Sequence, residues 1–371
     1  MSNNLPLSVK YRPKKLSEVI GQPVVVTAFT NAFECKTLHH AYILSGNYGT
    51  GKTTVARILA AMDNCEEGPT LEPCGKCSIC KDIFSGKSFD VKEMNAADAR
   101  GIDNIRTIQK EAYVYPIDCR VKYFILDEAH SMTKEASECA LKVIEEPPEF
   151  VRFILCSTEA HRFTDTIKSR CITWNLNKVS WTEIYNHLLN IVEKEKLNQK
   201  LDKAILRVAA KYARGSVRDA LQNVQTVINY CGDGEITFEK AIEALGKVNS
   251  ILYFNLFDAI IGNNISDCVL IINKIFQDGK EASSIIRDIE EHLNNLLLIK
   301  HCKEDLSVFS LTDNEIKTYN HQAEKLKSEA ILAMMGAIIE VGENLKTNID
   351  PQHLCNKFVI ESILKINKLK K

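Results

Sequence analysis

Glycines, a lysine and threonines between residues 41 and 54 stand at the spacing of a phosphate-binding loop. The stretch AYILSGNYGTGKTT matches G-x-x-x-x-G-K-[ST], with an apolar run before the loop and a helical run after it. Glycines let backbone N–H groups turn inward around phosphates, and the following helix N-terminus favours an anion. Lys52 is expected to reach the β- and γ-phosphates, and the Thr53 hydroxyl to hold Mg²⁺. The residues expected to bind a nucleoside triphosphate here are Gly46, Gly49, Thr50, Gly51, Lys52, Thr53 and Thr54.

An acidic pair ends an apolar run farther along the chain, in the stretch VKYFILDEAH. In open sheets of parallel strands, ligand chemistry gathers at the carboxyl ends of the strands. Asp127 can help to hold the Mg²⁺, and Glu128 can orient or deprotonate the attacking water. A lone Asp-Glu pair is usually a solvated strand end, but downstream of a phosphate loop the functional interpretation is favoured. His130 is interpreted as a polar loop residue without a catalytic role.

Four cysteines lie between the phosphate-binding loop and the acidic pair. They are Cys65, Cys74, Cys77 and Cys80, in the pattern C-x8-C-x2-C-x2-C. Four thiolates on a short polar insertion suit a tetrahedral structural Zn²⁺ that keeps no open position for catalysis. An iron–sulfur cluster is the rival, because C-x2-C-x2-C occurs in ferredoxins; those continue with a cysteine followed by proline, whereas Phe84 stands here. A site without metal is the third interpretation, and zinc is favoured over both.

The composition is that of an ordinary soluble protein of two or three domains. The chain has 371 residues, 45% of them hydrophobic and 26% charged, and its net charge of −1 gives no global attraction to nucleic acid. No stretch approaches a membrane span and no apolar signal core is present, which predicts a cytoplasmic protein without a membrane partner. The 13 cysteines should then be reduced. The scattered ones are expected to be small buried residues, among them Cys35, Cys119, Cys139, Cys156 and Cys171.

Strands that alternate with helical segments must position these groups, and they predict an α/β domain with a parallel, doubly wound sheet. The strands are expected at 41–44, 89–94, 121–126, 152–156 and 171–174. From Trp181 onward every pattern is helical, first at 181–195, 202–213 and 217–230. The predicted domains are a nucleotide-binding domain at 1–179, a small helical domain at 180–245 and an all-helical domain at 246–371.

A basic segment, YRPKKLSEVIGQ, precedes the first helix. One interpretation is a solvated arm. The other is a strap over the nucleotide base, in which Tyr11 and Val19 supply flat apolar contact. The sequence leaves both open.

Taken in order, these motifs resemble the gamma/tau subunits of bacterial DNA polymerase III, which are the ATPases of the sliding-clamp loader. The resemblance rests on GNYGTGKTT, the four-cysteine insertion after the phosphate-loop helix, FILDEAH, FILCST, the triplet at 169–171 and GSVRDA. The segments YRPKKLSEVIGQ and NAADARGIDNIR resemble the family as well. The insertion discriminates most, because most related ATPases lack it. The resemblance implies an AAA+ domain, a helical lid and an all-helical collar.

The resemblance also implies roles for three residues. Thr158 stands where the family has sensor 1, which hydrogen-bonds the γ-phosphate or the lytic water. Arg218 matches sensor 2, which couples lid closure to the γ-phosphate. Arg170 matches the arginine finger, which acts in trans on the ATP of a neighbouring subunit. Without the family, Arg170 would be only an arginine between two strands.

The implied function is ATP-driven opening and loading of the sliding clamp onto primed DNA. The implied partners are delta- and delta-prime-type subunits, further gamma/tau copies, the clamp and the backbone of primer–template DNA, contacted near Arg100 to Arg106. Two alternatives stay open: a non-hydrolysing, ATP-binding scaffold subunit, and a related DNA motor such as a branch-migration helicase. Tyr48 and Asn47 replace the family's common proline and basic residue, at positions where only backbone contacts are required. An end at Lys371 is expected for the short, gamma-type form.

Overall fold

The computed structural model divides the chain into two compact units, Met1–Phe238 and Glu239–Lys371. The helices that follow residue 180 belong to the first of these units. The structure describes residues 5–96, 102–197, 201–232, 234–245, 250–302, 311, 313–345 and 350–370. Arg100, one of the expected DNA contacts, lies outside the described residues.

The first unit contains a five-stranded sheet in the order β2-β3-β4-β1-β5, with every neighbouring pair parallel. The strands are β1 (Ala41–Gly46), β2 (Val91–Asn95), β3 (Lys122–Asp127), β4 (Val151–Ser157) and β5 (Ile172–Leu176). The parallel sheet is therefore confirmed. The second strand starts later than expected, at Val91, and the Phe89 side chain is exposed. An apolar letter before a strand does not by itself make it part of the strand.

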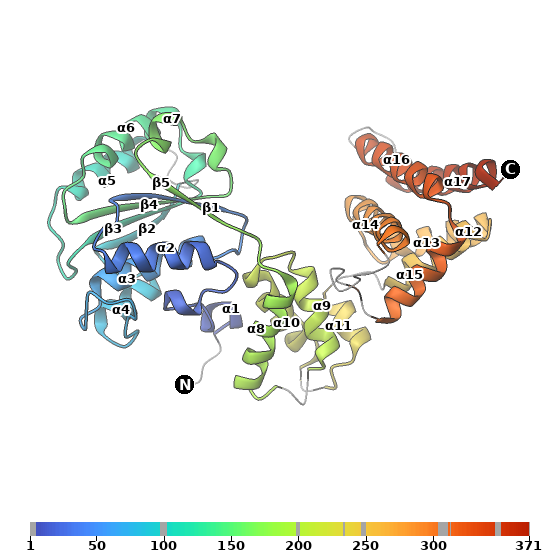
Figure 1. Ribbon diagram of the computed structural model, residues 1–371, viewed down its shortest axis with the longest axis horizontal. Helices are drawn as coiled ribbons and strands as arrows, with labels where there is room; N and C mark the ends of the chain where they lie inside the picture. Colours follow the sequence, from blue (N-terminus) through green and yellow to red (C-terminus); the bar gives the residue numbers. More distant parts are fainter. Residues whose placement is uncertain are drawn as a thin grey trace. The chain divides into compact units, whose positions relative to one another are not determined.

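Helices cover both faces of the sheet, as the doubly wound prediction requires (Figure 1). Because side chains alternate along a strand, Tyr42 and Leu44 of β1 pack on one face and Ala41 and Ile43 on the other. The first face is covered by α2 (Pro23–Glu34), α3 (Lys52–Asn64) and α4 (Ser78–Ser85). The second is covered by α5 (Ile102–Ala112), α6 (Lys134–Glu145) and α7 (Asp165–Lys168).

Three further helices complete the first unit: α8 (Trp181–Lys194), α9 (Lys203–Tyr212) and α10 (Val217–Cys231). Each begins at a capping side chain. Ser180 caps α8 in a reciprocal capping box with Glu183, Asp202 caps α9, and Ser216 caps α10. A short N-terminal helix, α1 (Leu7–Lys10), packs against α10, so the start of the chain is attached to this helical part.

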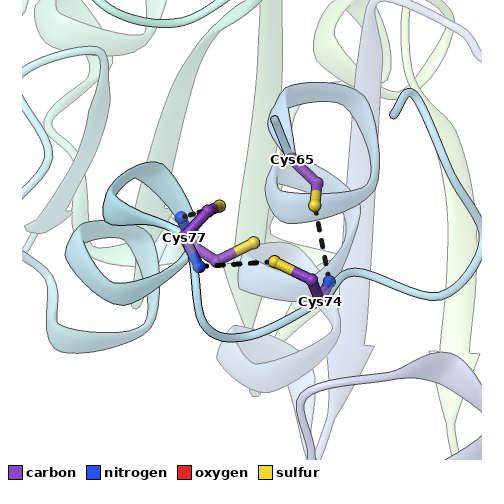
Figure 2. Close-up of side chains that lie close together, drawn as sticks. Cys65, Cys74 and Cys77 are labelled. Carbon is purple, nitrogen blue, oxygen red and sulfur yellow. Dashed lines mark hydrogen bonds between the residues drawn. The ribbon is translucent and has the colours of Figure 1, made fainter. Parts of the chain in front are cut away.

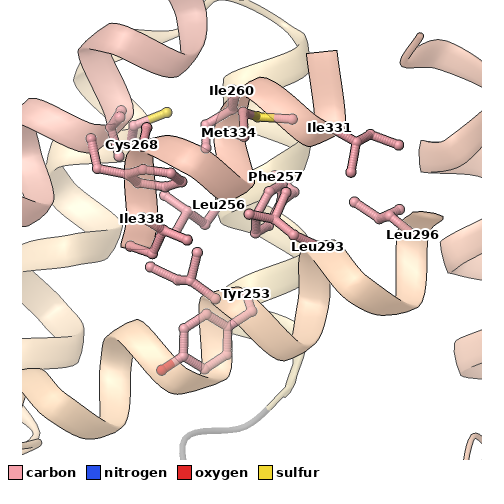
Figure 3. Packing of buried hydrophobic residues seen from close by; sticks show 14 of the residues in the cluster. Tyr253, Leu256, Phe257, Ile260, Cys268, Leu293, Leu296, Ile331, Met334 and Ile338 are labelled. Atoms are coloured by element: carbon pink, nitrogen blue, oxygen red, sulfur yellow. The ribbon is translucent and has the colours of Figure 1, made fainter. Parts of the chain in front are cut away.

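The second unit is helical wherever the structure describes it. Its elements are α12 (Ser250–Ile261), α13 (Ile265–Gln277), α14 (Ala282–His301), α15 (Asp313–Lys325), α16 (Ser328–Asn344) and α17 (Pro351–Lys370), after α11 (Phe238–Ala244) at the boundary. Figure 3 shows its apolar core, to which Phe257 of α12, Leu293 of α14 and Met334 of α16 contribute. Burying one such side chain stabilises the fold by about 1.5–3 kcal/mol.

The scattered cysteines divide by environment. Cys156, Cys171, Cys268 and Cys355 are buried, but Cys35 and Cys302 are exposed, so the expectation of burial is wrong for the exposed pair. Cys35 lies just after α2, and Cys302 just after α14, where the chain leaves the core. Among the residues that the structure describes, none of the helices combines the length and the apolar character needed to cross a membrane.

Candidate functional site

The phosphate-binding loop connects β1 to α3, as its spacing predicts. Gly46 must be glycine, because an added Cβ would lie 2.4 Å from the Leu176 carbonyl oxygen. Lys52 starts α3 and is 5% exposed; its Nζ donates hydrogen bonds to the carbonyl oxygens of Gly46 at 2.7 Å and Asn47 at 3.0 Å. Burial lowers the pKa of Lys52. A buried ammonium whose hydrogen bonds go to neutral carbonyls is a strong attractor for a phosphate.

The acidic pair lies beside the start of α3, at the carboxyl end of β3. The Thr53 hydroxyl donates to Asp127 Oδ2 at 2.9 Å. These two oxygens are hard ligands of the kind that Mg²⁺ prefers, and the ion would neutralise charge on the phosphates. Glu128 follows with φ of 48°, a left-handed conformation that directs its side chain away from the strand direction. Thr158, after β4, donates to Glu128 Oε2 at 3.2 Å.

His130 lies closer to this chemistry than the sequence indicated. Its Nδ1 is 3.5 Å from Glu128 Oε2 and 3.1 Å from the Ser157 hydroxyl, and only 10% of its side chain is exposed. The interpretation as a polar loop residue therefore omitted a neighbour of the acidic pair. The signal available in the sequence was its position, two residues after Glu128.

One pocket in the first unit brings most of the expected site residues together. Those lining it are Tyr11, Val19, Gly49, Thr50, Gly51, Lys52, Thr53, Thr54, Asp127, Glu128 and Arg218. Among the described residues, Gly46, Thr158 and Arg170 are site candidates that do not line it. The pocket joins the sheet domain to the helices that follow, because Arg218 belongs to α10.

Close packing joins the loop to α10. Gly49 has φ of 72°, and an added Cβ would lie 1.9 Å from the hydroxyl oxygen of Ser216, the capping residue of α10. Only glycine allows this approach. The N-terminus of α10 therefore sits directly against the phosphate-binding loop.

Sequence analysis missed further lining residues, of which Arg12, His187 and Leu221 are examples. Burial lowers the pKa of Arg12, and the like charges of Arg57 and Arg218 lower it further. Arg12 and Arg218 line the same pocket, so an anion bound between them would relieve their repulsion. The basic segment around Arg12 was visible in the sequence, but its approach to Arg218 was not.

The N-terminal arm reaches both the pocket and the helical part. Tyr11 lines the pocket, and its hydroxyl donates to Glu195 Oε1 at 2.5 Å. Lys10 Nζ lies 2.5 Å from the same carboxylate oxygen. Burial, and next the hydrogen bond to Glu195, raise the pKa of Tyr11 to about 12. Tyr11 therefore forms part of the pocket wall and is held to the helical part through Glu195, whereas Lys10 is exposed. The strap over the nucleotide base stays a prediction.

Arg170 lies away from the pocket of its own chain, on the segment before β5. Its Nη2 forms an ion pair with Glu145 Oε1 at 2.7 Å, and its Nη1 donates to the Thr166 carbonyl oxygen at 3.0 Å. The pairing with Glu145 raises the pKa of Arg170. Its Nε is buried without a partner among the described residues.

The four cysteines of the insertion converge. The sulfurs of Cys65, Cys74, Cys77 and Cys80 all lie within 4.8 Å of one another, and Figure 2 shows the first three directed toward a common point. One Zn²⁺ at about 2.3 Å from each sulfur would need separations of about 3.8 Å, which lie within the 4.8 Å limit of this cluster. A multi-iron cluster, whose thiolates bind different irons, needs wider spacing. The cluster geometry thus suits a single tetrahedral ion.

Backbone N–H groups already point at the sulfurs. Cys65 Sγ accepts from the Cys74 amide at 3.4 Å, Cys74 Sγ from the amides of Lys76 and Cys77, and Cys77 Sγ from the Cys80 amide at 3.3 Å. The amides of Lys76 and Cys77 lower the pKa of Cys74 to about 7, while burial raises that of Cys80. Such donors stabilise thiolates, the form that binds metal.

Comparison with known families gives two matches on the chain. Residues 21–180 match the family described as DNA polymerase III, delta subunit, and residues 236–363 match the family described as DNA polymerase III subunits gamma and tau domain III. The two matches follow one another along the chain without overlap.

Individual relatives agree with these matches. The chain is 36% identical to the DNA polymerase III subunit gamma of Buchnera aphidicola subsp. Acyrthosiphon pisum, over 78% of this chain and 80% of that relative. It is 32% identical to the subunit tau of Bacillus subtilis, over 92% of this chain and 60% of the relative. Among solved structures it is similar to the RuvB Holliday junction branch migration motor of Thermotoga maritima, with 18% identity, a TM-score of 0.48, and coverage of 68% and 79%.

Proposed function

The chain belongs to the family of gamma and tau subunits of DNA polymerase III, and from this membership we infer that it is an ATPase subunit of the clamp loader, the assembly that opens a sliding clamp and places it on primed DNA. The observation that carries the proposal is the pocket shared by Lys52, the Thr53–Asp127 pair and Arg218. These groups are a cation for phosphates, a pair of Mg²⁺ ligands and a second cation on a separate helix.

ATP would enter this pocket with its phosphates at the loop. Lys52 would exchange the carbonyls of Gly46 and Asn47 for phosphate oxygens, a stronger partner for a buried ammonium. Glu128, supported by Thr158, would orient the attacking water. Arg218 would bind the γ-phosphate and draw α10 toward the loop, and hydrolysis would remove that contact.

The remaining roles follow from family membership and are proposed with it. Arg170 would complete the pocket of a neighbouring subunit, where its guanidinium would stabilise transition-state charge. The chain would then act in a ring with delta- and delta-prime-type subunits and further gamma/tau copies. The helices of 180–245 would form a lid on the nucleotide domain of 1–179, and the helical region 246–371 would be the collar that holds the ring together.

We assign zinc to the four-cysteine cluster and Mg²⁺ with ATP to the pocket. The sulfur separations support zinc, and the Thr53 and Asp127 oxygens support Mg²⁺. A structural Zn²⁺ would cross-link the insertion and take no part in hydrolysis.

Contact with DNA would be made through phosphates and would carry no sequence preference. Such contact would bring the protein to the nucleoid, in the cytoplasm. The measurement is stimulation of ATP hydrolysis by primed DNA in the assembled loader across a salt series. Stimulation should fall as the salt concentration rises. Binding to phosphates is driven by the release of counterions from DNA, and that release is less favourable at high salt. If primed DNA fails to stimulate ATP hydrolysis at every ionic strength tested, the DNA contact is removed from the proposal.

A non-hydrolysing scaffold subunit is the second candidate. The residues that we propose for binding phosphate, Mg²⁺ and water, namely Lys52, the Thr53–Asp127 pair and Glu128, argue against it. The test compares wild type, Lys52→Ala and Glu128→Gln in the full complex. We expect Lys52→Ala to lose nucleotide binding, and Glu128→Gln to bind ATP while hydrolysis falls at least about a hundredfold. Equally poor hydrolysis by all three would establish the scaffold.

A branch-migration motor is the third candidate. It would need a DNA-binding end with strands, whereas every described secondary-structure element from Ser250 to Lys370 is a helix. The matched gamma and tau domain over 236–363 also favours the collar.

A further inference from the structure

The N-terminal arm contacts the four-cysteine insertion through the carboxylate of Glu72, and its Lys14 side chain lies near Gly75 of the insertion. Lys15 Nζ lies 2.7 Å from Glu72 Oε2, and the Ser17 hydroxyl donates to Glu72 Oε1 at 3.1 Å. Leu16, between them, is 3% exposed and belongs to the same apolar cluster as Cys65. Both carboxylate oxygens of Glu72 thus contact residues of the arm, and Leu16 between those residues packs in the core.

The same arm forms one wall of the nucleotide pocket on either side of this contact. The lining residues before it are Tyr11, Arg12 and Pro13, and those after it are Glu18, Val19 and Ile20. The Lys14 amide donates to Glu18 Oε2 at 2.8 Å, so the segment between the two lining groups is tied into a compact turn. A shift at the contact with Glu72 would therefore move pocket residues on both sides.

The cysteine cluster holds both ends of the loop that carries Glu72. The segment between Cys65 and Cys74, all of whose residues the structure describes, contains neither helix nor strand. Its two ends meet where the Cys74 amide donates to Cys65 Sγ at 3.4 Å, as Figure 2 shows. Glu72 stands two residues before Cys74. Within the loop, the Thr70 amide donates to the Met62 carbonyl oxygen at 2.9 Å and the Glu72 amide to the Thr70 hydroxyl at 3.1 Å. A metal that joins the two cysteines would add to these contacts by fixing the ends of the loop, and so would further restrict Glu72.

We propose that Glu72 is a positioning residue for the nucleotide, through which the four-cysteine insertion holds the arm in its pocket-lining conformation. This inference rests on the proposed binding of nucleotide to the pocket. Without Glu72 the arm would populate other conformations, and nucleotide binding would then have to order it at a cost in affinity. The insertion therefore serves the nucleotide site from outside it.

The test uses the full chain and a fluorescent ATP analogue. Glu72→Ala should raise the dissociation constant about two- to fivefold, the range expected for an exposed ion pair and its hydrogen bond. The matched control is Glu66→Ala, because Glu66 pairs with Ser78 inside the insertion, at 2.7 Å, and contacts no arm residue among those described. The control should leave affinity unchanged. Both variants should keep one zinc per chain by metal analysis.

A thermodynamic cycle adds a second readout. Lys15→Ala and Glu72→Ala should weaken binding by less together than the product of their separate effects, because each removes the same contact. Zinc removal by a chelator should weaken binding at least as much as Glu72→Ala, and Glu72→Ala should then add nothing.

Three results would overturn the proposal. Glu72→Ala with wild-type affinity would do so, provided that Lys52→Ala loses binding; equal binding by wild type and Lys52→Ala would instead refute the nucleotide site itself. Loss of zinc from Glu72→Ala would make Glu72 part of the metal site. Equal weakening by Glu66→Ala would show a general effect of the insertion's surface.

Discussion

A buried histidine should make the second unit sensitive to mild acid. His292 of α14 is 3% exposed; its ring stacks on Phe257 at 4.2 Å, and its Nε2 lies 2.9 Å from Gln322 Oε1. Gln322 in turn donates to the Phe254 carbonyl oxygen and to Asp258. Burial lowers the pKa of His292 from its ordinary value of 6.5 to about 3, and the hydrogen bond to Gln322 opposes only part of that shift.

The direction in which pH changes the free energy of unfolding follows from proton binding at His292. Between pH 6.5 and pH 3 the unfolded chain binds a proton at this histidine and the folded chain does not, so the free energy of unfolding falls as pH falls. The neutral, buried His292 contributes its full stabilisation above the pKa that this histidine has in the unfolded chain. From pH 7 to pH 5 the loss is about 2 kcal/mol, at 1.36 kcal/mol per pH unit below 6.5.

The assay separates the two units by their tryptophans. Both tryptophans of the chain, Trp174 and Trp181, belong to the first unit, so fluorescence follows that unit, and the helical signal in circular dichroism follows both. Urea unfolding of wild type and His292→Gln at pH 7 and pH 5 gives the free energy of each transition. The variant will be less stable at pH 7, but the wild-type advantage should shrink by about 2 kcal/mol at pH 5. An advantage that is the same at both pH values would refute the reasoning, and the fluorescence transition serves as the internal control.

Three further outcomes are expected. Gly49→Ala should weaken nucleotide binding about tenfold or more in a fluorescent-nucleotide titration, and adding Ser216→Ala should restore it only in part, because the left-handed φ of 72° remains. Thr53→Ala should abolish the gain in ATP affinity on adding Mg²⁺ and leave Mg²⁺-free binding within about twofold, whereas an unchanged Mg²⁺ response would exclude the pairing with Asp127 as the ion site. Zinc removal should lower the tryptophan-reported melting temperature by about 4–8 °C, a loss of about 2 kcal/mol, and no shift would mean that the cysteine cluster carries no metal.

The sequence was sufficient for the features that obey a local period or spacing. The phosphate loop, the acidic pair and the cysteines are short motifs whose chemistry fixes their separation, and all three form compact sites. The five strands were found because alternating burial on two covered faces leaves continuous apolar runs. Boundaries were less accurate, as Phe89 shows: its apolar side chain is exposed before β2.

Contacts between distant segments could not be predicted from motifs or periodicity, because no local spacing or pattern marks the two partners as a pair. Tyr11 meets Glu195 across 184 positions, and Ser17 meets Glu72 across 55. Each of these residues alone is an ordinary polar side chain on a surface segment. Only the fold shows that both contacts belong to one arm, attached at one end to α8 and at the other to the cysteine insertion.

For Arg170, the family resemblance and the structure give complementary information. The family resemblance assigns it to a neighbour's ATP, and the structure places it outside its own pocket, paired with Glu145. Exposed ion pairs contribute little, so Glu145 is too weak a partner to withhold the guanidinium from a triphosphate. It does fix the direction of the side chain, together with the Thr166 carbonyl. If Arg170 reaches a neighbour's ATP as proposed, Glu145 would orient it rather than inhibit it, because a pre-oriented arginine loses less conformational freedom when it meets the phosphate.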